Sequence, residues 1–254
     1  ASHVDIPSDG ETSKISYATY IRHRLTGFSG DSSRPTPQDL DDYPDFRDRL
    51  VKEGASAKYL RPVCKGEVKV KSMQPVRDDI ARLKAALAAN GMSEGFMNAV
   101  SPGTIAVFQP NEYYKTHEEY MFALADAMRE EYQEIVGSGL LLQVDCPDLA
   151  MGRHSRFKNL TDEEFLKAAH VQVDALNHAL ANVPADRVRL HICWGNYEGP
   201  HTHDIPLTSV LPLLFKAKPQ ALLIEGSNPR HEHEWEVWGE HKLPADKVLV
   251  PGVL

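Results

Sequence analysis

The chain has 254 residues, of which 42% are hydrophobic and 25% charged, so collagen-like, low-complexity and wholly disordered classes are excluded. Asp and Glu number 36 against 28 Lys and Arg, which gives a formal net charge of −8. This acidic balance argues against a nucleic-acid partner, because phosphate neutralisation needs clustered Lys and Arg. No apolar run approaches the roughly 20 residues of a membrane span. No targeting segment is recognisable, and the three cysteines do not form a secreted disulfide framework, so we expect a cytoplasmic protein with no membrane partner.

Short apolar segments alternate with longer amphipathic ones, which predicts an α/β fold. The predicted strands are residues 4–7, 96–100, 140–145, 188–193, 221–225 and 247–253. They are rich in Leu and β-branched residues without polar alternation, so we expect a parallel sheet that is covered on both faces. The predicted helices are residues 76–89, 116–136, 161–181 and 206–216, and Thr residues cap the second and third.

Residues 29–72 interrupt this alternation, first with a polar loop at 29–37 and then with a predicted β-ribbon at 58–71. Since no second hydrophobic cluster of domain size follows, we expect residues 1–254 to form a single (β/α) barrel domain with this excursion. One (β/α)8 TIM barrel needs about 250 residues, yet only six strands are recognisable. We therefore expect an incomplete barrel, from a truncated chain or the ordered part of a longer one, whose first and last strands are missing.

Polar residues lie at or just after the carboxyl ends of five of the predicted strands, where parallel sheets and barrels bind their ligands. These residues are 9–11, 101–104, Asp145, His191 with Cys193, and Glu225. His191 and Cys193 lie two residues apart on a strand and so share a face. Imidazole, thiolate and carboxylate are the ligands that Zn²⁺ prefers, and Glu225 at the next strand end is the expected third ligand. The alternative is a small buried cysteine beside a hydrogen-bonded histidine.

Four further histidines follow these strands in polar loops: His201, His203, His231 and His233. They are expected either to be solvated or to cover a substrate, and the sequence does not decide between the two. Asp148 is expected to be a solvated cap. Nucleophile-elbow, phosphate-loop and dinucleotide-binding motifs are absent from the sequence.

Four segments carry a resemblance to a known family: VDIPSDGE at 4–11, LQVDCPDL at 142–149, LHICWGNY at 190–197 and LLIEGS at 222–227. They resemble, in the same order, the cobalamin-independent methionine synthase family, and the loop after Cys193 is more similar to its short, single-barrel branch. That branch includes the epoxyalkane:coenzyme M transferases. The resemblance implies a (β/α)8 barrel with a zinc ion that activates a substrate thiol. The family's ligands are His, Cys, Glu and a second Cys, of which His191, Cys193 and Glu225 match the first three.

The resemblance further implies which residues bind the substrate. The acids that match Glu11 and Asp145 hold the ammonium group of homocysteine, and the turn at Ser101 lines the thiol pocket. The expected function is therefore that of a zinc-dependent methyltransferase of methionine biosynthesis, in which a zinc-bound homocysteine thiolate accepts a methyl group. The family further implies methyltetrahydrofolate as the methyl donor.

Two alternatives remain from the sequence. One is an epoxyalkane:coenzyme M transferase type of thiol alkylation, in which Arg22, Arg24, Arg61 or Arg153 would bind the sulfonate. The other is a non-catalytic barrel or pseudoenzyme, because the family's second zinc cysteine and its acid histidine would lie beyond Leu254. Cys146 is a poor substitute for that cysteine, since it is expected to point away from the face that Asp145 occupies. The fourth zinc ligand and the oligomeric state stay open.

Overall fold

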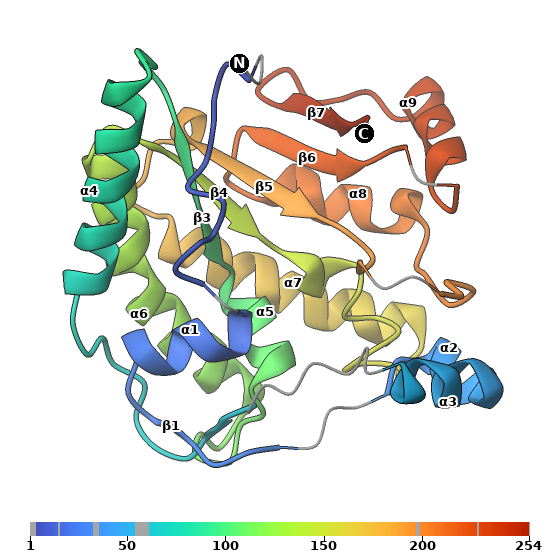
Figure 1. The fold of residues 1–254 in the computed structure, drawn as a ribbon. Coiled ribbons are helices and arrows are strands. Elements are labelled where there is room, and N and C mark those ends of the chain that lie inside the picture. The colour runs from blue at the N-terminus through green and yellow to red at the C-terminus, as the bar shows by residue number, and fades with distance from the viewer. Residues whose placement is uncertain are drawn as a thin grey trace.

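A five-stranded parallel sheet forms the centre of the protein (Figure 1). The computed structural model describes residues 4–14, 16–32, 36–53, 61–196, 199–227 and 229–253. The strands follow one another in chain order across the sheet: β3 (Phe96–Val100), β4 (Leu141–Asp145), β5 (Val188–Ile192), β6 (Ala221–Glu225) and β7 (Val248–Gly252). The predicted mixed α/β fold with a parallel sheet is therefore confirmed.

The predicted strand at residues 4–7 is wrong. Val4 and Ile6 are 51% and 36% exposed, and Ser8, one residue later, makes only an isolated parallel bridge to Phe96. A strand needs a neighbour along its length and an apolar face to bury, and this segment has neither among the described residues. The segment nevertheless leads directly to Glu11.

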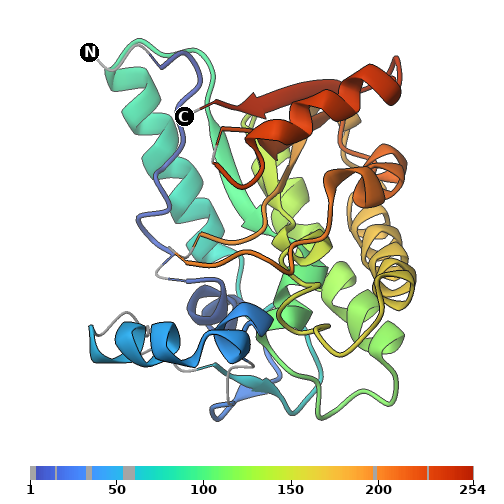
Figure 2. The ribbon, with the colours of Figure 1, turned by 90° about the vertical axis from the view of Figure 1, so that its right-hand side faces the viewer.

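Helices connect the strands: α4 (Gln74–Ala89) precedes β3, and α5 (Pro102–Phe108), α6 (His117–Gly137), α7 (Asp162–Ala179) and α8 (Leu207–Lys216) follow in turn. The helices α6, α7 and α8 lie on one side of the sheet and pack against one another in that order (Figures 1 and 2). Thr116 and Thr161 accept hydrogen bonds from the first turns of α6 and α7, and Glu164 completes a capping box on α7. The predicted caps are thus confirmed, and α5 is a helix where the sequence indicated only a turn.

The two faces of the sheet differ in chemistry, although the sequence indicated strands without polar alternation. Residues at alternate positions of β4 and β5, such as Leu142, Val144 and Leu190, are fully buried apolar side chains of the core. The intervening positions carry Gln143 and Asp145 on β4, and Arg189 and His191 on β5. The pairing places Gln143 beside Arg189 and Asp145 beside His191, so one face of the sheet holds a row of polar groups.

The N-terminal part and the excursion form a layer of short elements. They are α1 (Tyr17–Arg24), β1 (Phe28–Ser29), α2 (Gln38–Asp42), α3 (Pro44–Lys52) and β2 (Val63–Cys64). The predicted ribbon is confirmed only in part, since β2 pairs antiparallel with β1 over two residues and residues 58–60 lie outside the described chain. The remaining short elements are η1 (Pro147–Leu149), η2 (Ala185–Arg187), η3 (Glu232–Glu236) and α9 (Val237–Glu240). Among the helices described here, none combines the length and apolarity that crossing a membrane requires.

Candidate functional site

A hydrogen-bond network joins three of the predicted site residues at the carboxyl ends of β3, β4 and β5. The carboxylate of Asp145, only 1% exposed, lies 2.9 Å from Nδ1 of His191. Asn98 on β3 donates from Nδ2 to Oε1 of Glu11 over 2.8 Å and to Oδ2 of Asp145 over 3.3 Å. Glu11, Asp145 and His191 therefore lie in one network, and Asn98, which bridges Glu11 and Asp145, was not identified from the sequence.

Glu11 holds a strained backbone conformation beside this network. Its φ of 55° is the one positive φ of a non-glycine residue in the described chain, and such strain persists where the surroundings impose it. Burial and the nearby Asp145 carboxylate raise the pKa of Glu11, while Lys14, whose ammonium donates to the Asn98 carbonyl, partly offsets the rise. Two carboxylates that repel each other make an environment that a bound ammonium group would stabilise.

His191 and Cys193 form the core of the predicted metal site. Burial disfavours the charged His191 ring, but its hydrogen bonds to Asp145 and Cys193 outweigh this and raise the pKa of His191 to about 10. Because Nδ1 faces Asp145, Nε2 is the atom that can bind a metal, and a carboxylate behind a ligating histidine is the usual arrangement. Cys193 is a free, half-buried thiol. A nitrogen and a sulfur donor with this support fit a zinc ion.

Glu225, the predicted third ligand, lies at the neighbouring strand end but is turned onto its own backbone. Ile192 pairs with Ile224, so Cys193 and Glu225 each follow a residue of the same pair. The Glu225 carboxylate accepts hydrogen bonds from the backbone N–H groups of Gly226 and Ser227, at 3.0 and 3.1 Å. Its role as a ligand stays a prediction.

Ser101 makes a separate cluster with Asp148. Its hydroxyl caps α5 and donates to the Asp148 carboxylate over 2.7 Å, and Thr104 donates to the same oxygen over 2.6 Å. Asp148 is 2% exposed, so the expectation of a solvated cap is wrong, and burial raises its pKa to about 6. The role of Ser101 in substrate binding stays a prediction.

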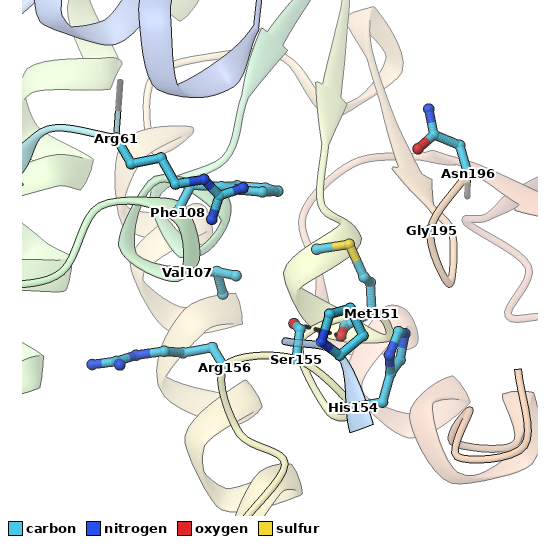
Figure 3. A pocket seen from close by; sticks show the side chains of 10 residues that line it. Arg61, Val107, Phe108, Met151, His154, Ser155, Arg156, Gly195 and Asn196 are labelled. Carbon is cyan, nitrogen blue, oxygen red and sulfur yellow. Dashed lines mark hydrogen bonds between the residues drawn. The ribbon is translucent and has the colours of Figure 1, made fainter. Parts of the chain in front are cut away.

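A pocket opens next to Cys193, and Figure 3 shows its lining. Met151 lies in its wall and donates its backbone N–H to the Cys193 carbonyl, and Gly195 and Asn196 follow Cys193 in sequence. Arg61 stacks on the Phe108 ring, with its guanidinium carbon 5.0 Å from the ring centre, on the opposite side of the pocket from Asn196 (Figure 3). The other lining residues are Pro37, Val107, His154, Ser155 and Arg156. Of the arginines predicted as possible sulfonate ligands, Arg61 is the one that lines this pocket.

Two of the four loop histidines are more buried than a solvated loop allows. The side chains of His201 and His231 are 1% and 6% exposed, and each places a ring nitrogen 2.8 Å from Oδ2 of Asp204. His154 lies 3.4 Å from the other oxygen of Asp204. His203 is half-buried and pairs with Asp42 over 2.5 Å, whereas His233 is exposed. Burial lowers the pKa of His154; burial alone would raise that of Asp204, but its hydrogen bonds to His201 and His231 lower it.

His154, His201 and Asp204 are the one group of three metal-ligating side chains whose ligand atoms all lie within 4.8 Å of one another in the described chain. His154 and Asp204 were not identified from the sequence. An acid follows each of two histidines at a distance of three residues: Asp204 follows His201, and Glu234 follows His231. This spacing could have indicated buried histidine–carboxylate pairs.

No protein-family model matches the chain. The methionine synthase of Saccharolobus solfataricus is 25% identical over 210 residues, which cover 82% of this chain and 53% of that protein. The methionine synthase of Sulfolobus acidocaldarius is 25% identical over 79% of this chain and 49% of its own length. This chain thus spans about half the length of the curated relatives it matches. Among solved structures, a B12-independent methionine synthase from Shewanella sp. W3-18-1, in complex with selenomethionine, superposes with a TM-score of 0.67 at 18% identity, over 98% of this chain and 65% of that one.

Proposed function

Given that the chain is related to the cobalamin-independent methionine synthases, we propose that it belongs to a methyltransferase that transfers a methyl group to the thiol of homocysteine. The observation that carries the proposal is the convergence of Glu11, Asp145 and His191 at one end of the sheet, with Cys193 beside them. We further propose that the sheet is part of a (β/α)8 barrel and that residues 1–254 belong to one domain. The cytoplasmic location stays a prediction.

His191 and Cys193 would hold the zinc ion, with Glu225 as the candidate third ligand. When bound, zinc lowers the pKa of a coordinated thiol, whose ordinary value is about 8.5, and so supplies thiolate at neutral pH. Asp145 orients the His191 ring through Nδ1. If the Glu225 carboxylate turns away to bind a metal, the backbone N–H groups of Gly226 and Ser227 lose their acceptor. Both residues are only partly buried, so these N–H groups can donate to solvent instead.

The carboxylates of Glu11 and Asp145 would bind the ammonium group of homocysteine. Burial and the repulsion from Asp145 together raise the pKa of Glu11, and a cation that lies between the two carboxylates relieves that repulsion. Asn98 keeps both carboxylates oriented through a single side-chain amide. The pocket lined by Met151 and Phe108 adjoins the thiol position, so it is the proposed place for the methyl donor, for which methyltetrahydrofolate is the expectation.

Coenzyme M is the competing thiol, and Arg61 is the observation in its favour, since a guanidinium beside the pocket would suit a sulfonate. Coenzyme M carries no ammonium group, so it gives the Glu11–Asp145 pair nothing to bind. Removal of the Glu11 charge should therefore weaken the binding of homocysteine and leave the binding of coenzyme M unchanged.

The test uses the chain loaded with Co²⁺ in place of zinc, so that a thiol binding the metal changes the sulfur-to-cobalt charge-transfer absorption. We expect homocysteine to change this absorption and Glu11→Gln to weaken homocysteine binding at least tenfold, with coenzyme M unaffected. A response to coenzyme M alone would favour the alkylation alternative. A metal-loaded protein that responds to neither thiol would favour the non-catalytic barrel.

A further inference from the structure

Three loops far apart in sequence meet at the carboxylate of Asp204. His154 comes from the segment after η1, His201 and Asp204 come from the loop between β5 and α8, and His231 precedes η3. Asp204 lies 2.8 Å from ring nitrogens of both His201 and His231 and 3.4 Å from Nε2 of His154. The Asp204 carboxylate is therefore the point at which these three loops are joined.

Buried polar atoms at this place are left without hydrogen bonds. Nδ1 of His154, Oδ1 of Asp204 and Oδ2 of nearby Asp39 have no hydrogen-bond partner in the described part of the chain. His154 is 1% exposed, Asp39 is fully buried, and the Asp204 side chain is 6% exposed. Folded proteins leave few such atoms unsatisfied, so several in one cluster indicate a missing ligand.

The charges at the cluster favour a cation as that ligand. Asp204, Asp39 and Glu234 contribute three carboxylates, and Glu234 lies 3.0 Å from Nδ1 of His231. His231 also stacks on Trp194, with ring centres 4.0 Å apart, so its ring is fixed between Asp204 and Glu234. His231 can offset at most one of these three charges, and a buried excess of negative charge is costly unless a cation compensates it.

We propose that His154, His201 and Asp204 bind a divalent transition-metal ion at a second site, separate from the His191–Cys193 pair. Two imidazoles and one carboxylate suit Zn²⁺, Co²⁺ or Ni²⁺, whereas Ca²⁺ and Mg²⁺ prefer oxygen ligands alone. His231 and Glu234 would orient the Asp204 carboxylate from behind, as outer partners of metal ligands do.

The bound ion would hold together the wall of the pocket beside Cys193. His154 lines that pocket next to Met151 and Ser155 (Figure 3), and its Nε2 lies 3.0 Å from the carbonyl of Trp194, the residue after Cys193. Thr202, between the two ligands His201 and Asp204, donates its backbone N–H over 2.7 Å to Asp39 of α2. The ion would thus fasten the excursion segment to the loops around the candidate active site.

Co²⁺ titration of the metal-free chain tests the proposal, because a thiolate ligand gives charge-transfer absorption and a site of nitrogen and oxygen ligands gives only weak ligand-field bands. We expect Cys193→Ser to retain one Co²⁺ per chain without charge transfer. Adding His201→Ala or Asp204→Asn to Cys193→Ser should abolish that binding, with at least a hundredfold loss of affinity. In otherwise wild-type protein, the same changes should leave the charge-transfer band intact.

Asp42→Asn is the matched control, since it breaks the contact to His203 in the same loop without removing a ligand, and it should keep the second ion. Circular dichroism of each metal-free variant establishes folding, and His154→Gln replaces any variant that does not fold. The proposal is overturned if Cys193→Ser binds no Co²⁺, or if its bound Co²⁺ survives Asp204→Asn. If the wild-type chain binds Co²⁺ without any charge-transfer band, the proposed methyltransferase site is contradicted and this second site stays supported.

Discussion

The carboxylate of Asp145 lies 2.9 Å from Nδ1 of His191, across two neighbouring strands whose register makes the two residues direct partners. Nε2 of Gln143 donates a second hydrogen bond to the same carboxylate oxygen, over 2.8 Å. The His191 ring is therefore oriented by the sheet itself, with Nε2 directed away from Asp145.

Replacing Asp145 by Asn should weaken zinc binding about 10- to 100-fold, the usual effect of losing a carboxylate behind a histidine ligand. The amide keeps the size of the side chain but removes the charge that favours the bound tautomer of His191. Competition with a coloured chelator measures the affinity. Asp162→Asn, which removes an exposed partner of Arg153, is the control and should leave the affinity unchanged; an equal affinity of the Asp145 variant would contradict a ligand role for His191.

The buried Asp148 carboxyl should make stability depend on pH in a narrow window. Its pKa is about 6 in the folded protein against an ordinary value of 3.8, so between these values the folded state holds a proton that the unfolded state has released. The free energy of unfolding should therefore fall as pH rises through this window, by about 3 kcal/mol in total. Below the window the contribution is fully present.

Asp148→Asn tests this, because the amide has nearly the same shape and does not titrate. Urea unfolding of both proteins between about pH 4 and pH 7 gives the two stability curves. The wild type should lose stability relative to Asp148→Asn as pH rises. A constant difference between the two curves would mean that the pKa of Asp148 is not raised.

Gly103 in the first turn of α5 should tolerate no side chain. A Cβ there would lie 1.9 Å from Oδ2 of Asp148, which Ser101 and Thr104 hold in place through the other carboxylate oxygen. Gly103→Ala should therefore cost about 1–3 kcal/mol in the free energy of unfolding. At Gly137, at the end of α6, a Cβ would meet no atom within 4 Å, and Gly137→Ala should be neutral or stabilise the protein by up to about 1 kcal/mol. Urea unfolding of the two variants measures both changes in the free energy of unfolding. Equal changes would contradict the close contact between Gly103 and Asp148.

The sequence predicted the strands and helices correctly where the apolar residues of a segment are also the ones that the fold buries. The apolar segments of β3 to β6 each bury residues in the core, and Leu249 of β7 packs against it. The Thr caps of α6 and α7 need only neighbouring backbone. The segment at 4–7 has a similar composition but an exposed Val4, because burial depends on neighbours that a short pattern does not specify. The polar face was missed because Gln143 and Arg189 are single polar residues within otherwise apolar runs.

Sequence patterns also predicted part of the candidate site. Asp145 and His191 converge because the ends of neighbouring parallel strands meet at one edge of the sheet. Glu11 reaches them from a segment that is not a strand, through its hydrogen bond to Asn98, and its role was implied by the family resemblance. Asp148 and His154 could not be assigned in this way. Their partners lie 47 residues away at Ser101 and 50 residues away at Asp204, so only the tertiary fold shows that these side chains are buried.

Arg24 should contribute to stability and not to thiol selectivity, although it was a candidate sulfonate ligand. Its guanidinium lies 2.6 Å from Asp79 and 2.5 Å from Glu131, and all three side chains are at most 6% exposed. Arg24→Ala removes the ion-pair partner of the buried Glu131 and leaves the buried Asp79 with only Arg82 and Ser13, so it should cost about 3–5 kcal/mol. Arg77→Ala removes an exposed pair with Glu134 and should cost about 0–1 kcal/mol. Chemical unfolding measures the free energy of unfolding of both variants. The structural role of Arg24 would be wrong if Arg24→Ala cost as little as Arg77→Ala. It would also be wrong if Arg24→Ala folded and changed the preference between homocysteine and coenzyme M.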